Sequence, residues 1–152
     1  MSAIESNLSA AHAEVKAEIA RTDTKTSLLL AFVGALLAGA WTVAKDASLS
    51  VPACVVGSLG MALLLAAACL LLSAVRPNLG GARPVGFPRW ATLSAEEITA
   101  ELAEDRRARD IAGLSRIAVA KFTGLKQAVD LTRAGGALLV LAALIQAGGA
   151  LV

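Results

Sequence analysis

Three long runs without a charged residue, joined by basic segments with helical periodicity, predict an all-α integral membrane protein with three transmembrane helices and a cytoplasmic helical stalk. The 152-residue chain is 57% hydrophobic and 17% charged, whereas a typical soluble domain has about 25% charged residues. No Asp, Glu, Lys or Arg occurs in 26–44, 47–75 or 134–152. A helix needs about 17–25 residues to cross a bilayer, so we predict spans at 26–44, 51–75 and 134–152 within a single membrane domain, 1–152.

Basic residues orient these spans. Segment 76–133 carries ten Lys and Arg and segment 1–25 carries three, whereas the loop between the first two spans carries Lys45 alone. Lys and Arg are enriched in cytoplasmic loops. We therefore predict that 1–25 is a cytoplasmic amphipathic helix and that 76–133 is a cytoplasmic loop followed by a long helix. The N-terminus is then cytoplasmic and the C-terminus lies outside.

Apolar residues recur every three or four positions in both cytoplasmic segments, which is typical of helices that pack along a seam. Ser94 and Glu97 have the spacing of a capping box, so a helix is expected from Ala95 largely through to Arg133. The polar run 104–110 predicts a bend or a change of phase in that helix. We hypothesise that the two stalk helices pair in parallel. Their seams are Ile4, Leu8, Ala11, Val15, Ile19 and Thr22, and Ile111, Leu114, Ala118, Phe122, Leu125, Val129 and Thr132.

The sequence R-T-D-T-K, from Arg21 to Lys25, stands directly before the first span. Residues four apart share a helix face, so Arg21 and Lys25 stack together while Asp23 points the other way. Two interpretations stay open. Asp23 either faces the bundle and pairs with a basic residue, or it belongs to an ordinary solvated helix end. The candidate partners are Arg133, Lys126 and Arg76.

The segment from Arg76 to Leu93 contains three Pro and three Gly and predicts an irregular loop. Compact domains seldom keep loops longer than about 12–15 residues unless they are functional or disordered. Trp90 either packs on the stalk or at lipid headgroups, or it stacks on a ligand base. Arg76 and Arg89 are able to meet a phosphate, although basic residues are expected on this side of the membrane in any case.

Catalytic and metal-binding patterns are absent from the sequence. His12 is the only histidine, and there is no metal-ligand cluster, Ser/His/Asp constellation or phosphate-binding glycine loop. We therefore expect no enzyme activity, no catalytic residue, no metal, no cofactor and no nucleic-acid partner. Gln146 in the third span is expected to hydrogen-bond to another helix, either in the same chain or in a copy. Small residues four apart in the spans favour close helix packing, and we expect a homo-oligomer.

Several short motifs resemble the Pycsar effector transmembrane family of bacterial antiphage proteins. They are R-T-D-T-K-T-S-L-L-L with Asp23-Thr24-Lys25 at the first span, A-V-R-P with Arg76-Pro77 after the second, and F-P-R-W-A-T-L-S-A-E-E-I. The resemblance covers nearly the whole chain. It implies a multi-pass protein of the bacterial inner membrane that responds to cyclic CMP or cyclic UMP, made by a partner pyrimidine nucleotide cyclase, and then impairs the membrane.

The leading functional interpretation is thus a nucleotide-gated effector in the lipid bilayer. The chain has no room for a separate nucleotide-binding β-barrel, so the ligand would bind to the cytoplasmic helices, the loop or a pocket between subunits. The alternative is a membrane-anchored helical scaffold or regulator that recruits a partner through its stalk. The candidate ligand-binding or gating residues are Arg21, Asp23, Lys25, Arg76, Arg89 and Trp90.

Overall fold

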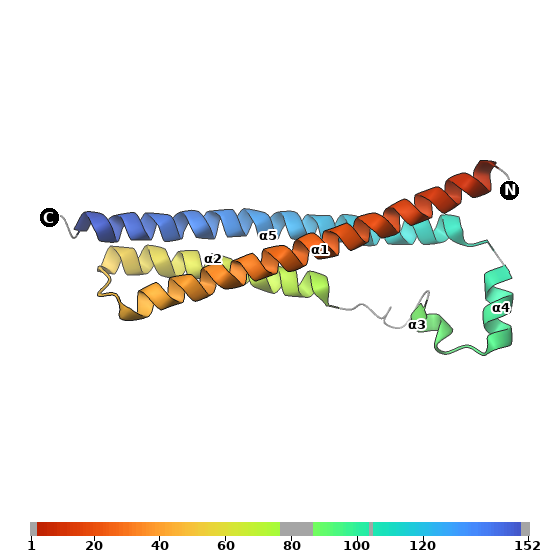
Figure 1. Cartoon of the computed structure of the whole chain (residues 1–152), viewed down its shortest axis with the longest axis horizontal. Helices are drawn as coiled ribbons and strands as arrows, with labels where there is room; N and C mark the ends of the chain where they lie inside the picture. Colours follow the sequence, from red (N-terminus) through yellow and green to blue (C-terminus); the bar gives the residue numbers. More distant parts are fainter. Residues whose placement is uncertain (1–2, 77–86, 104, 150–152) are drawn as a thin grey trace. The chain divides into compact units, whose positions relative to one another are not determined.

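The computed structural model describes residues 3–76, 87–103 and 105–149, and these residues form helices and connections with no strand among them. The predicted all-α fold is confirmed. The helices, in chain order, are α1 (Ala3–Asp46), α2 (Val51–Val75), α3 (Phe87–Trp90), α4 (Ala95–Ala103) and α5 (Arg107–Gly149) (Figure 1).

Three of these helices, α1, α2 and α5, contain stretches long and apolar enough to cross a membrane. This agrees with the three predicted spans, and the protein is a multi-pass membrane protein. α1 and α5 run without interruption through the predicted span boundaries at Thr26 and Ala134. Those boundaries, and the cytoplasmic side of the N-terminus, therefore remain predictions.

The chain divides into two compact units, which we describe separately. Unit 1 comprises Met1–Glu18 and Arg76–Ala118, and unit 2 comprises Ile19–Val75 and Val119–Val152. Unit 1 contains α3, α4 and the first turns of α1 and α5. Unit 2 contains α2 and the remaining, more apolar parts of α1 and α5.

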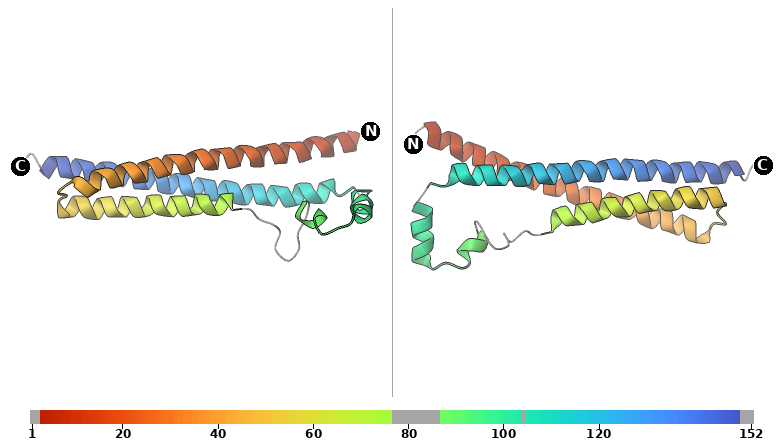
Figure 2. Two further views of the ribbon diagram at one scale, coloured as in Figure 1. Left: turned by 60° about the horizontal axis from the view of Figure 1, so that its bottom comes forward. Right: turned by 180° about the vertical axis from the view of Figure 1, so that it is seen from behind.

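In unit 2, α1 and α5 run in the same direction and α2 runs in the opposite one. Asp23 with Lys121, and Ser48 with Gln146, are contacts between α1, or the residues directly after it, and α5, and both have a sequence separation of 98. A constant separation means parallel helices in a fixed register. Figure 2 shows the three segments from two further sides. Their buried core is formed by Val33, Leu64, Leu71 and Ala128.

α2 and α5 approach each other closely at a pair of glycines. A Cβ atom on Gly60 would lie 2.9 Å from the carbonyl oxygen of Gly135, and a Cβ on Gly135 would lie 2.9 Å from that of Gly60. Glycine is therefore required at both positions. Lipid is as apolar as a leucine side chain, so helices in a membrane associate through close packing rather than through the hydrophobic effect, and small residues at the contact allow this.

Two buried hydroxyl groups in unit 2 form hydrogen bonds within their own helices. Thr26 donates a hydrogen bond to the carbonyl of Thr22 at 2.8 Å, and Thr132 donates one to the carbonyl of Ala128 at 2.7 Å. Each bond runs back four residues, which is a common way for threonine to satisfy its hydroxyl in a helix. Thr26 and Thr132 are thus buried with their hydroxyl groups hydrogen-bonded.

Helices occupy more of the predicted stalk than expected at one point. The segment from Arg76 to Leu93 is not wholly irregular, because it includes α3, while residues 77–86 lie outside the described residues. The segment from Ala95 to Arg133 is largely helical, as expected, and is divided into α4, which ends at Ala103, and α5, which begins at Arg107. The break falls in the polar run for which we predicted a bend. This run lacks an apolar face, so packing does not hold a continuous helix there.

The predicted capping box at the start of α4 is confirmed. The backbone N–H of Ser94 donates to the Glu97 carboxylate at 2.8 Å, and the N–H of Glu97 donates to the Ser94 hydroxyl at 3.3 Å. The two residues satisfy each other's backbone donors and fix the first turn of α4.

Candidate functional site

The Asp23 carboxylate is paired with a lysine, as one of the two sequence interpretations required. It accepts a hydrogen bond of 2.5 Å from the ammonium of Lys121 on α5, and the side chains of Asp23 and Lys121 are 48% and 24% exposed. The partner is not one of the three candidates named from the sequence. Those candidates assumed that Asp23 lies level with the start of the charge-free run of α5. The register between α1 and α5 instead brings an earlier turn of α5 to Asp23.

Arg21 and Lys25 lie on the outer side of α1. Both are exposed, while Asp23 between them is only partly exposed and Thr22 and Thr26 are buried. Of the two interpretations that the sequence left open, the structure agrees with the one in which Asp23 faces the bundle and pairs with a basic residue. The result is an ion pair between two helices with further positive charge outside it, directly before the charge-free run of α1.

The sequence contained a signal for Lys121 that the predicted seam passed over. The seam was traced through Phe122, whose side chain is 39% exposed. Lys121 is three residues after Ala118 and four before Leu125, so it fits the same periodicity, and Ala128 follows it on the buried face. A seam traced mainly through apolar residues passes through Phe122. Such a search does not detect a lysine that faces a carboxylate on the neighbouring helix.

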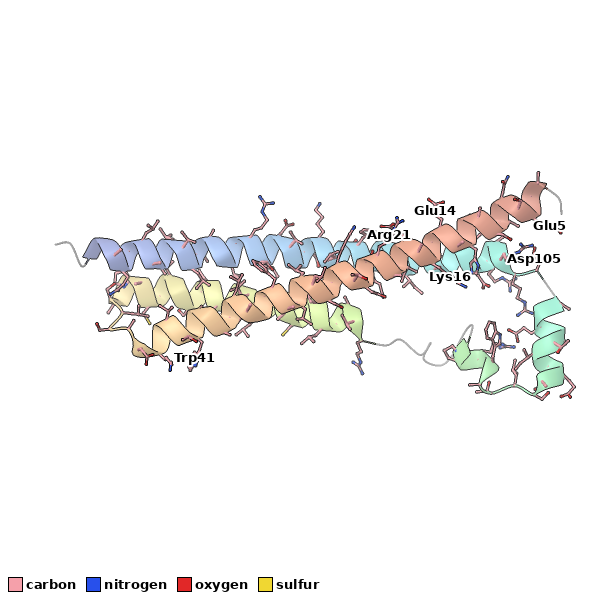
Figure 3. All side chains as sticks on the ribbon, viewed as in Figure 1. Glu5, Glu14, Lys16, Arg21, Trp41 and Asp105 are labelled. Carbon is pink, nitrogen blue, oxygen red and sulfur yellow. The ribbon has the colours of Figure 1, made fainter. Side chains whose placement is uncertain are left out.

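A second polar contact closes the far end of unit 2. The Gln146 side chain on α5 accepts a hydrogen bond from the Ser50 N–H at 2.9 Å and donates one to the Ser48 carbonyl at 3.1 Å. Gln146 was expected to bond to another helix or to a copy of itself, but it binds the backbone between α1 and α2. The exposed Trp41 lies near this end of α1 (Figure 3).

In unit 1, α3 presents the two candidate ligand residues Arg89 and Trp90. The Nε atom of Arg89 lies 2.8 and 3.0 Å from the two oxygens of Glu101 on α4. Arg106 is a second cation on this carboxylate, at 3.4 Å. The side chain of Glu101 is only 15% exposed, while Trp90 is 39% exposed. Arg89 thus holds an anionic partner and is followed by an accessible indole, and no pattern in the sequence pointed to Glu101.

The start of α5 is tied to α1 within unit 1 by Arg107. Its guanidinium forms a two-pronged contact with Asp105, at 2.9 and 2.8 Å, and also donates to the Ser9 hydroxyl and the Glu5 carbonyl. The hydrogen bonds from the side chain and backbone of Arg107 lower the pKa of Asp105 to about 2. The same contact raises the pKa of Arg107 above its ordinary value. The backbone bond also satisfies an N–H in the first turn of α5.

The six candidate residues are divided between the units. Arg21, Asp23 and Lys25 belong to unit 2, where Asp23 meets Lys121, and Arg76, Arg89 and Trp90 belong to unit 1. Arg76 is exposed and directly follows α2. Within the described ranges, no group of three or more His, Cys, Asp or Glu is placed to hold a metal ion.

Comparison with protein families identifies the chain. A family model described as the Pycsar effector protein domain matches residues 7–148. The chain belongs to the Pycsar effector family. The match extends over the membrane helices as well as α3 and α4, and it confirms the resemblance seen in the motifs around Asp23 and Arg76. The family is one of effectors rather than a known enzyme family. No curated protein and no solved structure matches the chain.

Proposed function

We propose that this Pycsar effector impairs the bacterial inner membrane when it senses a cyclic pyrimidine nucleotide, cyclic CMP or cyclic UMP, made by a partner cyclase. The observation that carries the proposal is the family match over 7–148 on a chain with three helices able to cross a membrane. Because most of the chain lies in these helices, we infer that the protein exerts its effect on the lipid bilayer.

We place nucleotide binding at α3. Trp90 offers an accessible aromatic face on which a pyrimidine base can stack. Arg89 offers a guanidinium suited to phosphate, and this guanidinium is paired with Glu101. A cyclic phosphate would compete with the Glu101 carboxylate for Arg89. Arg76 would supply further positive charge to the same ligand.

We assign gating to Arg21, Asp23 and Lys25. The Asp23–Lys121 pair holds α1 and α5 in one register at the start of the charge-free run of α1. A ligand shifts such an equilibrium only if it binds one state more tightly than the other. The pair would keep α1 and α5 joined in both states, so that a ligand-induced shift of one helix also moves the other. Asp23→Asn and Lys25→Ala are expected to weaken activation without removing the protein from the membrane.

Expression in bacteria with cyclic UMP or cyclic CMP, followed by a membrane-potential dye, tests the function. The proposal expects depolarisation with one nucleotide and none without it. An unchanged potential with both nucleotides contradicts it. That result would favour a membrane-anchored scaffold that recruits a partner through its polar helices.

Tryptophan fluorescence tests the ligand site, because the chain has two tryptophans and no tyrosine. In a Trp41→Phe protein all tryptophan emission comes from Trp90, and a stacked base should quench it in a saturable way. Trp90→Phe, which retains Trp41, is the matched control and should show no saturable change. The α3 site is excluded if neither nucleotide alters Trp90 emission while the potential still responds to one of them.

A further inference from the structure

A stripe of charge follows α5 on the side that does not pack in unit 2. We call Lys126, Asp130 and Arg133 the α5 charged stripe. Steps of four and three residues place them on one helix face, and all three are exposed. The buried residues Ala128 and Thr132 lie on the opposite face. Figure 3 shows nitrogen-tipped side chains standing on the side of α5 away from α2.

The register with α1 gives the depth of this stripe in the membrane. Contacts between α1 and α5 have a separation of 98, and subtracting 98 from 133 places Arg133 level with Ala35. Ala35 lies ten residues beyond Lys25, the last charge before the apolar run of α1. Ten helical residues span about 15 Å. The hydrocarbon core is about 30 Å thick, so this register places Arg133 near its middle rather than at the boundary of the span predicted at 134–152.

The contacts of α2 give the same depth independently. Gly135, two residues after Arg133, meets Gly60 and Leu64. These residues lie near the middle of α2, which is 25 residues long and carries no charge. The charged stripe therefore lies at a level where both neighbouring helices are apolar.

A single copy of the chain leaves these charges facing lipid. Lys126 is close enough to the end of the apolar run of α1 for its long side chain to reach the headgroups. Asp130 is too short and Arg133 too deep to do so. Among the residues that the structure describes, none of the three forms an ion pair. Charged side chains within membrane helices normally face protein or water and pair with one another.

We propose that the α5 charged stripe is the surface through which copies of this chain assemble in the membrane, with Asp130 of one copy paired to a basic stripe residue of the next. The positive-inside rule gives all copies the same orientation, so α5 meets α5 in parallel. Lys126 and Arg133 lie about 6 and 4.5 Å from Asp130 along the helix axis, within reach of long side chains. Parallel copies place identical residues at the same level, so the pairing depends on the long side chain of Lys126 or Arg133 reaching along the axis to Asp130 of the neighbouring copy.

The same face continues toward the C-terminus as an exposed apolar surface. Val140 and Leu144 are 62% and 64% exposed, and they follow Arg133 at helical spacing. Apolar packing below the charged level therefore extends the contact between copies. The exposed residues of this continuation are Ala137, Val140, Leu141 and Leu144.

Cysteine crosslinking in isolated membranes tests the assembly, which does not depend on the proposed nucleotide response. The exposed native thiols of Cys54 and Cys69 are first replaced by alanine. Ala137→Cys then lies on the proposed contact face, and Phe32→Cys is the matched control. Phe32 is 54% exposed on α1, and the separation of 98 places it level with Asp130. We expect disulfide-linked dimers from Ala137→Cys and at least several-fold fewer from Phe32→Cys.

Charge variants in the Ala137→Cys background test the pairing itself. Asp130→Lys makes the stripe uniformly positive, and we expect a fall of about tenfold in the crosslinked fraction, which corresponds to about 1.4 kcal/mol. The triple variant Lys126→Asp, Asp130→Lys and Arg133→Asp restores alternating charge and should restore crosslinking. If Asp130→Lys fails to reach the membrane, Asp130→Asn replaces it and should still lower the crosslinked fraction.

Each experiment is performed without nucleotide and with cyclic UMP or cyclic CMP. The proposal is overturned by equal crosslinking at Phe32→Cys and Ala137→Cys, by no crosslinking under any condition, or by crosslinking that is insensitive to the charge variants. Charge-dependent crosslinking without any depolarisation supports the assembly and contradicts only the proposed membrane impairment.

Discussion

The Asp23 carboxylate and the Lys121 ammonium lie 2.5 Å apart and join α1 to α5 where α1 passes from its charged turns into its charge-free run. At this level Thr22 and Thr26, one residue before and three residues after Asp23, are buried. The pair therefore fixes two parallel helices against sliding. One residue of slippage would separate the two charges by about 1.5 Å along the axis.

Removing this pair should weaken the packing of unit 2 by a measurable amount. We expect Asp23→Asn and Lys121→Gln each to lower stability in detergent. The double variant should be less destabilised than the sum of the two, because the lost interaction is shared. Ion pairs at exposed sites stabilise a protein by about 0.2–1 kcal/mol. We expect a coupling free energy between the two substitutions near the upper end of this range, because the pair is only partly exposed. Thermal unfolding of the four proteins measures this coupling.

Lys16→Gln is the control for that cycle, because Lys16 is also a lysine of a long helix, but it is exposed and lies in unit 1. It should show no coupling with Asp23→Asn. Strictly additive effects of Asp23→Asn and Lys121→Gln would mean that the pair does not stabilise the contact.

The contact between Gly60 and Gly135 predicts opposite effects at two adjacent glycines of α5. Gly135→Ala places a Cβ 2.9 Å from the Gly60 carbonyl oxygen, so the helices must separate. Overpacking of this kind costs about 1–3 kcal/mol. Gly136 has nothing within 4 Å of the same added atom, so Gly136→Ala should instead stabilise the helix by about 0.5–1 kcal/mol. Thermal unfolding in detergent compares the two, and equal effects would exclude the close approach.

Small residues show why helices were easier to predict than their contacts. Charge-free length alone identifies three membrane helices. Small residues four apart are frequent in Ala-rich spans, so spacing did not select the pairs that matter. Ala53 is buried, and a Cβ atom added to Gly57 would contact Ala142. A Cβ atom added to Gly34 would meet nothing within 4 Å. The decisive contact between α2 and α5 depends on register, which no single helix encodes.

In the candidate site too, features of a single helix could be predicted from the sequence, whereas contacts between helices could not. Helical periodicity placed Asp23 away from Arg21 and Lys25, which needs only the geometry of one helix, but it did not decide between a bundle-facing and a solvated carboxylate. The identity of Lys121 required the relative positions of α1 and α5. The same holds for Glu101, since a carboxylate on α4 becomes the partner of Arg89 only after the chain turns between α3 and α4. Local signals such as the Ser94–Glu97 capping box were recovered because both partners lie within one turn.

Gln146 should stabilise the α1–α2 connection through its amide alone. Gln146→Met keeps the length of the side chain but removes the acceptor for the Ser50 N–H and the donor to the Ser48 carbonyl. Each hydrogen bond is worth about 0.5–1.5 kcal/mol, so we expect a loss of about 1–3 kcal/mol in thermal unfolding. Hydrogen exchange at the Ser50 amide should also accelerate.

Ser48→Ala provides the control, because Ser48 takes part through its backbone carbonyl rather than its hydroxyl. It should leave both the unfolding transition and the Ser50 exchange rate close to those of the parent. A large effect of Ser48→Ala, or none of Gln146→Met, would contradict the assigned role of the amide.

The contact between Asp105 and Arg107 predicts how the start of α5 responds to acid. Hydrogen bonds from Arg107 lower the pKa of Asp105 from 3.8 to about 2. A depressed pKa in the folded state means that the contact stabilises the fold at any pH above about 3.8 and loses that contribution as the pH falls toward 2. The start of α5 should therefore be unaffected between pH 8 and pH 5.

Carbon-13 NMR of the Asp105 carboxyl group in micelles should give a titration midpoint near 2. Arg107→Gln should move this midpoint toward 3.8, whereas Arg109→Gln, which leaves the contact in place, should not. A parent midpoint near 3.8 would show that Arg107 does not hold the carboxylate in solution.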